Sequence, residues 1–399
     1  MGGTAPQRSF DRFIVIVCDS LGCGDAPDAE AFGDSGANTI ASIVQQAYPT
    51  LPHLARLGLG RIPGVPPLAG GAPEPGEPLA SFGRMTERSG AKDTMSGHWE
   101  LMCVISHEAF PMYPQGFPPE VMTRFEEAIG RRTLGNIAAS GTEIIHDLGG
   151  EHMRTGAPIV YTSGDSVFQV AAHEDVIPVD ELYAMCDVAR AQLEGPHRVA
   201  RVIARPFVGS GPDDFKRTPR RRDYALPPPR PTALDILVAA GLRTHAVGKI
   251  HDIFAGRGLS DYTKTVSNAD GVDKTIAAMR SNSAELIFTN LVDFDSLYGH
   301  RRDVTGYAAA LEEFDDAVPR LLDAMGPRDC LVLTADHGND PAFRGTDHTR
   351  ERVPLLVSSR FPVRDLGTRG SFADLGQTVL HNFGLQGDSG ESFLPAISG

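Results

Sequence analysis

Four short runs of apolar residues along the chain predict strands that are buried on both faces. They are rich in Val, Ile and Leu and lie at residues 12–19, 284–292, 330–334 and 353–357. Runs of this length without polar alternation are typical of parallel sheets covered by helices. Between the second and third runs, residues 306–325 repeat apolar side chains at helical spacing, and these are Leu311, Phe314, Val318 and Leu321. Strands alternating with helices predict an α/β fold with a mostly parallel sheet flanked by helices.

Proline-rich stretches mark boundaries in this pattern. Residues 60–80 hold scattered prolines, and Pro227, Pro228, Pro229 and Pro231 predict a stiff linker, because such a run can neither continue a helix nor complete a sheet. The region before the linker has apolar runs of its own at residues 158–161 and 199–208. We therefore expect a smaller α+β domain, residues 105–224, inserted in a discontinuous core formed by residues 1–104 and 225–399.

Composition excludes several classes of protein. The 399 residues are 41% hydrophobic and 22% charged, which is ordinary for a globular chain and unlike a disordered or fibrous one. No apolar run approaches the roughly 20 residues that span a bilayer, and residues 1–12 lack the apolar stretch of a secretory signal. The five cysteines are few and odd in number, which fits a reducing compartment. We expect a cytoplasmic protein with no membrane partner.

The charge of the chain is unevenly distributed. The formal net charge is −14, which argues against a nucleic-acid partner and, taken alone, against an anionic substrate. Residues 198–222, however, hold seven Arg and one Lys against only Asp213 and Asp214. Such a run is usually a solvated surface, but Arg is also the side chain best suited to bidentate phosphate recognition. The sequence therefore predicts a basic face on the inserted domain.

Acidic residues and histidines gather where the predicted strands end. Three aspartates follow strands and three histidines lie near them, and the six are Asp19, Asp295, His300, Asp336, His337 and His348. Ligands of open α/β sheets bind at the carboxyl edge of the strands. A single Asp at such a place is usually a helix cap or turn residue, but six coincident residues favour metal binding. Mixed carboxylate and imidazole ligands suit Mn²⁺ or Zn²⁺, and six of them suit two ions that share a substrate oxygen.

The segment AKDTMSGHWE, residues 91–100, is a second concentration of reactive side chains. It holds Lys92, Thr94, Ser96, His98 and the only Trp of the chain. A nearby divalent ion can activate a hydroxyl as a nucleophile, and the start of a helix can hold a phosphoryl group. The alternative is an ordinary Ser or Thr cap of a helix over residues 97–105. Spacing alone favours that alternative and does not choose between the two hydroxyls.

Together these motifs resemble the bacterial phosphopentomutases, a family of the alkaline phosphatase superfamily. The resemblance rests on VCDSLGCGDAPDAEAFGDSGANT, KDTMSGHWE, YTSGDS, RVIARPF, RTPRRRDYAL, VGKIHDIF, LVDFDSLYGHRRD, TADHGNDP and GTDHTRERVPLL. They occur in order from about residue 13 to 357 and so cover nearly the whole chain. The resemblance implies an alkaline-phosphatase-like core with an inserted cap domain.

The resemblance also implies roles for individual residues. One Mn²⁺ would be held by Asp19, Asp336 and His337, and the other by Asp295, His300 and His348. Thr94 would be the phosphorylated nucleophile, which selects it over Ser96 by analogy. The cap would supply substrate contacts, and the positions implied for substrate binding are Ser163, Asp165, Arg201 and Lys249. Arg205 and Arg217 compete with Arg201 for the contact to the distal phosphate.

The activity implied is the interconversion of ribose 1-phosphate and ribose 5-phosphate, and of their 2-deoxy analogues. It would pass through a phosphothreonine enzyme and a sugar bisphosphate. Two Mn²⁺ ions would be required, with other divalent ions possible, and glucose 1,6-bisphosphate or a pentose bisphosphate would act as activator. Sugar phosphates would be the partners, and we expect a monomer.

Two other functions are compatible with part of the pattern. One is another enzyme of the same superfamily, either a phosphomonoesterase or a cofactor-independent phosphoglycerate mutase. A serine nucleophile is expected in that mutase, so the KDT motif argues against it. The other is a non-catalytic metal-binding protein, which would have no need to retain all six ligands together with Thr94.

Overall fold

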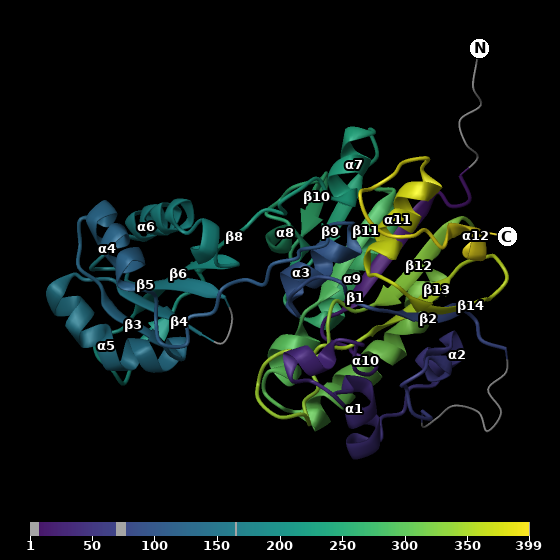
Figure 1. Cartoon of the computed structure of the whole chain (residues 1–399), viewed down its shortest axis with the longest axis horizontal. Helices are drawn as coiled ribbons and strands as arrows, with labels where there is room; N and C mark the ends of the chain where they lie inside the picture. Colours follow the sequence, from purple (N-terminus) through teal and green to yellow (C-terminus); the bar gives the residue numbers. More distant parts are fainter. Residues whose placement is uncertain (1–7, 69–76, 164–165, 399) are drawn as a thin grey trace, which may run out of the picture. The chain divides into compact units, whose positions relative to one another are not determined.

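A computed structural model describes residues 8–68, 77–163 and 166–398 of the chain. The chain divides into two compact units (Figure 1). Unit 1 consists of Met1–Glu108 and Pro228–Gly399, and unit 2 consists of Ala109–Pro227. Unit 2 is therefore an insertion in the sequence of unit 1, and the chain leaves it within the proline-rich linker. None of the helices in the described ranges has both the length and the apolar character needed to cross a membrane.

Unit 1 contains a sheet of eight strands. The strands are β1 (Arg12–Cys18), β2 (Ser81–Met85), β9 (Thr244–Val247), β10 (Asp261–Thr263), β11 (Leu286–Leu291), β12 (Asp329–Thr334), β13 (Val353–Ser358) and β14 (Asp365–Arg369). Their order in the sheet is β10-β9-β11-β1-β12-β13-β2-β14. β1 lies at the centre and pairs in parallel with both β11 and β12, whereas β13 runs antiparallel to both of its neighbours.

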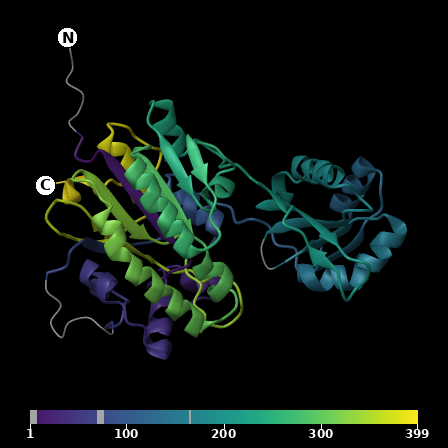
Figure 2. The same ribbon diagram turned by 180° about the vertical axis from the view of Figure 1, so that it is seen from behind.

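Helices cover both faces of this sheet. They are η1 (Ala29–Phe32), α1 (Thr39–Ala47), α2 (Pro52–Leu57), η2 (Leu59–Arg61), α3 (Thr94–Leu101), α7 (Ala233–Ala239), α8 (Ile250–Ile253), α9 (Asn268–Ser281), η4 (Phe294–Gly299), α10 (Val304–Asp323), α11 (Ala373–Asn382) and α12 (Leu394–Ile397). α9 and α10 lie on one face, seen in front in Figure 2, and α3, α7 and α11 lie on the other. The central strands β1, β11 and β12 are fully buried.

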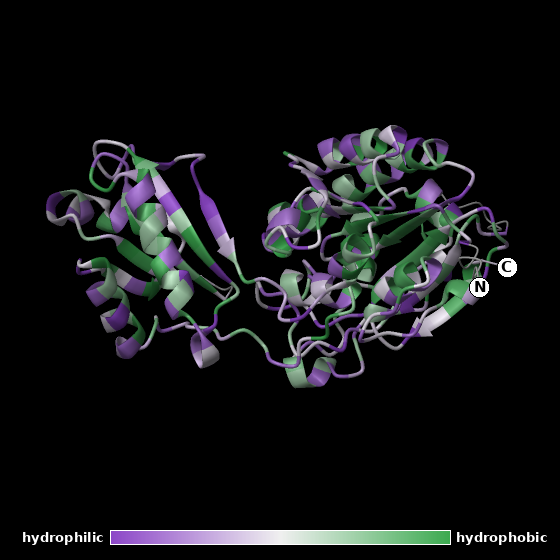
Figure 3. Ribbon diagram, turned by 90° about the horizontal axis from the view of Figure 1, so that it is seen from above, coloured by the Kyte–Doolittle hydropathy of each residue, from purple (hydrophilic) through white to green (hydrophobic). Residues whose placement is uncertain are grey.

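Unit 2 has a mixed sheet of its own. Its strands are β3 (Leu134–Ala138), β4 (Ile159–Thr162), β5 (Val167–His173), β6 (Arg201–Val208), β7 (Lys216–Arg217) and β8 (Arg222–Ala225). Its helices are α4 (Pro119–Ile129), α5 (Gly141–Thr155), α6 (Val179–Gln192) and the short η3 (Gly195–His197). α4 and α6 pack with one apolar cluster and α5 with another. The inner strands of both units are largely hydrophobic, whereas edge strands are more polar and the helices alternate in polarity (Figure 3).

The strands and the long helix expected from the apolar pattern of unit 1 are confirmed. The four apolar runs form β1, β11, β12 and β13, and α10 buries the four side chains that define its apolar face. The α/β fold with a mostly parallel sheet is likewise confirmed. β13 is the exception in direction, so its amino end, rather than its carboxyl end, lies where β1 and β12 end.

Candidate metal centre and nucleophile

The carboxyl ends of the central strands bring together the six side chains expected to bind metal. Asp19 follows β1, Asp336 and His337 follow β12, and Asp295 lies in the π-helical turn η4 after β11. His300 directly follows that turn, and His348 lies in the loop that leads into the antiparallel strand β13. Because β13 runs antiparallel, this loop reaches the same edge of the sheet.

The inner ligand group consists of Asp19, Asp336 and His337, whose side chains are completely buried. His337 Nε2 lies 3.5 Å from Asp19 Oδ1 and 3.3 Å from Asp336 Oδ2. The turn after β1 is strained, since Ser20 has a φ of 70°. A non-glycine residue in this region costs about 1–3 kcal/mol, and here the strain turns the Ser20 N–H towards Asp336 Oδ1, 3.1 Å away.

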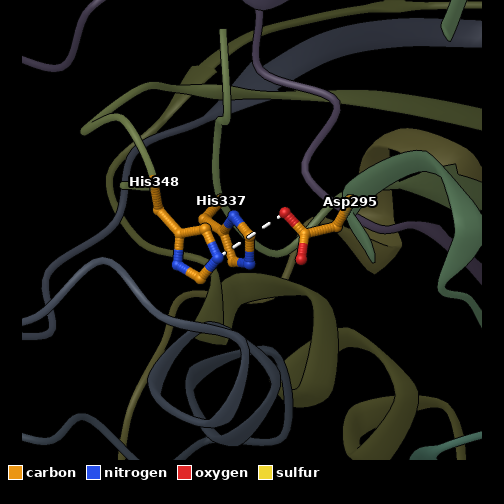
Figure 4. Close-up of side chains that lie close together, drawn as sticks. All are labelled: Asp295, His337 and His348. Carbon is orange, nitrogen blue, oxygen red and sulfur yellow. Dashed lines mark ion pairs between the residues drawn. The ribbon is translucent and has the colours of Figure 1, made fainter. Parts of the chain in front are cut away.

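The outer ligand group consists of Asp295, His300 and His348. His300 Nε2 lies 3.2 Å from Asp295 Oδ2 and 3.0 Å from His348 Nε2, and His348 Nε2 lies 3.5 Å from Asp295 Oδ1. His337 also faces this group, because its ring stacks on that of His348 with centroids 4.0 Å apart. Figure 4 shows Asp295, His337 and His348 pointing towards one another. His337 therefore lies between the two groups.

All three imidazoles present the same nitrogen to the centre. His300 Nδ1 lies 3.0 Å from the Thr346 carbonyl, His337 Nδ1 3.1 Å from the Gly338 carbonyl and His348 Nδ1 2.9 Å from the Lys92 carbonyl. A carbonyl only accepts hydrogen bonds, so each Nδ1 carries a proton and each Nε2 faces the centre of the site. Metal-binding histidines are commonly fixed in this way.

Electrostatics at this edge are dominated by buried carboxylates. Burial, together with the neighbouring charges of Asp336 and Asp295, raises the pKa of Asp19 well above its ordinary range. Burial also acts on Asp336, but the imidazoles of His337 and His98 outweigh it and lower the pKa of this carboxyl to about 2. Burial lowers the pKa of His337 to about 4, so its ring is neutral at pH 7. Such a cluster favours a cation.

The residues at this edge fit a divalent cation. Among the described residues, the buried oxygen Asp19 Oδ1 has no hydrogen-bond partner, although it faces His337 Nε2, and Asp336 Oδ2 faces His337 Nε2 and His98 Nδ1. A buried carboxylate oxygen without a partner is costly, and a bound cation removes that cost. Neutral imidazoles and carboxylates together form the donor set of Mn²⁺ and Zn²⁺ sites.

The two hydroxyls of the KDT segment differ in what they contact. α3 begins at Thr94, and its N-cap is Asp93, whose side chain accepts from the backbone N–H groups of Met95 and Ser96. The alternative of a Ser or Thr cap for a helix over residues 97–105 is therefore wrong. Ser96 Oγ donates to Asp93 Oδ2 at 2.8 Å, whereas Thr94 Oγ1 lies 3.2 Å from His337 Nε2. Thr94 is thus the hydroxyl that faces the candidate ligands.

Helix α3 approaches the inner group closely because residue 97 is glycine. A Cβ atom at this position would lie 2.0 Å from the backbone oxygen of Asp336. The loop that precedes α3 is held in place by Arg350, whose side chain is fully buried. Arg350 Nη1 donates to Glu87 Oε2 at 2.7 Å and to the Ala91 carbonyl at 2.6 Å. These contacts fix the position from which Thr94 projects.

The expected substrate residues are spread over both units. Lys249 lies in unit 1 as the N-cap residue of α8, and not in the inserted unit, and its charge opposes the rise in the pKa of Asp19. Ser163 and Arg201 belong to unit 2, where Arg201 Nη1 lies 3.7 Å from Asp223 Oδ2. Asp165 lies outside the described residues.

Unit 2 also contains a basic cluster that faces a buried hydroxyl. Tyr161 Oη is buried and has no hydrogen-bond partner among the described residues. Arg205, Arg217 and Arg221 are the nearby cations that oppose the rise in the Tyr161 pKa caused by burial. A Cβ at Gly141, the first residue of α5, would lie 2.6 Å from Tyr161 Oη. Arg217 Nη1 would lie 3.3 Å from the same Cβ position, so this cluster borders the N-terminus of a helix.

Several polar residues at the site had no role predicted from the sequence. Asn290 in β11 and Asn339 after β12 donate to carboxylate oxygens of Asp19 and Asp295, at 2.8 Å and 2.7 Å. His98, one turn after Thr94 on α3, lies 3.0 Å from Asp336 Oδ2. The signal that could have identified Asn290 is a single amide within the apolar run of residues 284–292.

Comparison with known proteins assigns the chain to a family. The family model described as the Metalloenzyme superfamily matches residues 11–387. A phosphopentomutase of Acetivibrio thermocellus is 52% identical over 97% of this chain and 99% of its own length. One of Desulfitobacterium hafniense strain DCB-2 is 53% identical over 96% of this chain and 98% of its own length.

Among solved structures, a phosphoglycerate mutase of Leishmania mexicana is 14% identical with a TM-score of 0.48, over 98% of both chains. Sequence identity to this structure is far lower than the 52% and 53% identity to the two phosphopentomutases, which extends over nearly the whole chain. The chain belongs to the phosphopentomutase family of metalloenzymes.

Proposed function

We propose that the protein interconverts ribose 1-phosphate and ribose 5-phosphate, and their 2-deoxy analogues, through a phosphothreonine at residue 94. The observation that carries this proposal is the position of the Thr94 hydroxyl. It lies 3.2 Å from His337 Nε2 among six potential metal ligands, while the competing hydroxyl of Ser96 is engaged by Asp93. Such an arrangement suits a nucleophile that carries a phosphoryl group next to cations.

The proposed cofactor is a pair of Mn²⁺ ions. The inner ligand group would hold one and the outer ligand group the other, with His337 between them. When bound, the ions supply positive charge that stabilises the transferring phosphoryl group and lower the pKa of a coordinated hydroxyl. Zn²⁺ is the principal competitor for the same donor set, and a metal titration decides between the two ions.

In the proposed cycle, phospho-Thr94 transfers its phosphoryl group to the free hydroxyl of a bound sugar monophosphate. The bond from phosphorus to Thr94 Oγ1 breaks and a bond from phosphorus to the sugar oxygen forms. The proton that the sugar hydroxyl loses is taken up by the released Thr94 oxygen. The product is a pentose bisphosphate. Return of its other phosphoryl group to Thr94 reverses these changes and regenerates the phosphoenzyme. A bisphosphate such as glucose 1,6-bisphosphate supplies the first phosphoryl group.

We infer that unit 2 holds the phosphate that does not react. Arg205 and Arg217 lie near the Tyr161 hydroxyl at the N-terminus of α5, and this hydroxyl has no hydrogen-bond partner within the described ranges, which supports this inference. Arg201 is less suited to this role because it lies close to the carboxylate of Asp223. Ser163, Asp165 and Lys249 are proposed to contact the sugar.

The test is an incubation of the protein with Mn²⁺, a catalytic amount of glucose 1,6-bisphosphate, and ribose 1-phosphate. Appearance of ribose 5-phosphate at a rate that depends on the bisphosphate supports the proposal. Release of inorganic phosphate without ribose 5-phosphate would instead identify a phosphomonoesterase. Omission of Mn²⁺ after treatment with a chelator is the matched control.

A further inference from the structure

A chain of buried polar side chains joins the two carboxylates of the inner ligand group. Asn290 Nδ2 lies 2.8 Å from Asp19 Oδ2 and 3.3 Å from His98 Nε2. His98 Nδ1 in turn lies 3.0 Å from Asp336 Oδ2 and 2.8 Å from the Thr94 carbonyl. Asn290 is 1% exposed and His98 0%. Neither residue belongs to the six expected ligands.

The direction of each hydrogen bond in this chain follows from the chemistry of the groups. Both carboxylates and the carbonyl of Thr94 accept, so the Asn290 amide donates to Asp19 and the Nδ1 of His98 carries a proton, which faces the Thr94 carbonyl and Asp336 Oδ2. His98 Nε2 then has a lone pair that accepts the second N–H of Asn290. The imidazole is therefore fixed as a single tautomer.

This arrangement turns one oxygen of each carboxylate towards His337. Asp19 is held through Oδ2 by Asn290, and Asp336 is held through Oδ1 by the backbone N–H of Ser20. Asp19 Oδ1 has no hydrogen-bond partner among the described residues, and Asp336 Oδ2 lies 3.0 Å from His98 Nδ1. An amide at residue 290 thus determines which oxygen of Asp19 is available.

We propose that Asn290 and His98 are positioning residues, which orient Asp19 and Asp336 for the inner cation and link that orientation to the backbone of Thr94. The proposal rests on the metal site of the proposed function. It explains a feature that packing alone does not, because a buried amide in a strand is costly, and Asn290 Oδ1 has no hydrogen-bond partner in the described part of the chain. A leucine would fill the same space without that cost.

The test measures Mn²⁺ affinity by titration calorimetry on the full-length protein freed of metal by a chelator. Asn290→Leu removes the donor to Asp19 and keeps the volume, and we expect it to weaken the tighter Mn²⁺ site roughly 10- to 100-fold. The matched control is Asn382→Leu, which removes another buried asparagine that forms two hydrogen bonds with the backbone of Phe10, away from the site. It should leave Mn²⁺ affinity unchanged.

A second pair of variants keeps the test decisive where Asn290→Leu does not fold. In His98→Asn the amide can replace Nδ1 as donor but loses the acceptor for Asn290, and in His98→Gln the side chain can replace Nε2 but loses the donor. Each breaks one link, so each should weaken Mn²⁺ binding less than His98→Leu does. Equal affinity in the wild type and all three His98 variants would overturn the proposal.

Failure of this inference is distinguishable from failure of the proposed function. A wild type that binds no Mn²⁺ would contradict the metal site itself. A wild type that binds Mn²⁺ with the same affinity as Asn290→Leu, while the variant without metal unfolds at a lower temperature, would show that Asn290 only supports the fold. The positioning role is supported if Asn290→Leu binds Mn²⁺ more weakly than wild type, and if the metal-free variant has an unfolding temperature no lower than that of Asn382→Leu.

Discussion

The two ligand groups of the candidate site differ in their exposure. The side chains of Asp19, Asp336 and His337 are 0% exposed, whereas the side chain of His300 in the outer group is 32% exposed. The inner group follows two central strands that pair along their full length. The outer group is assembled from the π-helical turn η4 and the loop before β13. One half is thus built on the sheet and the other on its loops.

This difference suggests a division of roles between the two halves. The inner carboxylates are fixed by strand register and by buried donors, and Thr94 faces the same half. The outer histidines are fixed by the carbonyls of Thr346 and Lys92, which belong to loops. Substitutions in the inner group should therefore abolish function, and those in the outer group should weaken a site that added metal can refill.

The largest effect is expected from Asp336→Ala. This change removes the carboxylate that lies beside both His337 and His98, so activity with Mn²⁺ should fall roughly 10³-fold or more. Excess Mn²⁺ should not restore the activity, because the Asp336 side chain is completely buried and water cannot readily replace it. The measurement is the ribose 1-phosphate assay over a range of Mn²⁺ concentrations, and recovery at high Mn²⁺ would contradict the distinction between the two groups.

A smaller and reversible effect is expected from His300→Ala. Loss of this partly exposed ligand should reduce activity about 10²-fold at low Mn²⁺, with partial recovery as Mn²⁺ increases. Water can replace an imidazole at an accessible position more readily than at a buried one. A loss of activity that no Mn²⁺ concentration reverses would contradict the expected difference between His300 and Asp336.

Gly97→Ala tests how closely α3 must approach the inner group. The new methyl group would lie 2.0 Å from the Asp336 carbonyl oxygen, so the helix that carries Thr94 must shift. A displacement of about 1 Å at a reacting group can cost about 10²-fold in rate. We expect kcat to fall by that order while the outer group still binds metal.

Gly150→Ala is the control for this substitution, since it lies in α5 with open space around its Cβ position. It should leave kcat unchanged and should not lower the unfolding temperature. A similar fall in kcat for both variants would mean that the effect of Gly97→Ala is not due to contact with Asp336.

The smallest effect is expected from His152, a buried imidazole of unit 2 that lies far in sequence from the six ligands. Burial lowers its pKa, and its Nε2 accepts from the backbone N–H of His173 at 2.8 Å. The unfolded chain therefore takes up a proton as pH falls through about 6.5, while the folded chain resists it, so stability is lost in that direction.

His152→Gln can keep the acceptor for His173 but cannot titrate. The metal-free variant should lose less stability than wild type between about pH 7.5 and about pH 5.5. The measurement is the urea midpoint at each pH, with the exposed His146→Gln as control. Equal pH dependence of stability in wild type and His152→Gln would contradict this expectation. The difference between the two proteins measures the effect of a buried imidazole that is not among the six ligands.

Much of the sheet could be predicted from the sequence because buried parallel strands are apolar along their whole length. β1 and β11 were recognisable in this way, and the aspartates that follow them marked the edge of the site. The antiparallel direction of β13 could not be predicted, since direction is not encoded in the apolar character of a strand. The prediction of a Ser or Thr cap is wrong because the carboxylate of Asp93, and not a hydroxyl, accepts from the first backbone N–H groups of α3.

The supporting residues of the site were beyond prediction for a related reason. Asn290 reaches Asp19 only because β1 and β11 pair with Val17 opposite Asn290, and this register is a property of the folded sheet. His98 and Asp336 are 238 residues apart in sequence and meet where Gly97 lets α3 approach the sheet. Motif spacing identifies ligands that act together but not the neighbours that orient them.

The central claim is that Thr94 carries the phosphoryl group, and peptide mass analysis tests it most directly. The protein is incubated with Mn²⁺ and glucose 1,6-bisphosphate, quenched and digested, and the peptide containing residues 92–100 is fragmented. We expect one phosphoryl group on Thr94, and its absence in Thr94→Ala with metal content unchanged. A phosphoryl group on Ser96, or a Thr94→Ala variant with full mutase activity, would contradict it.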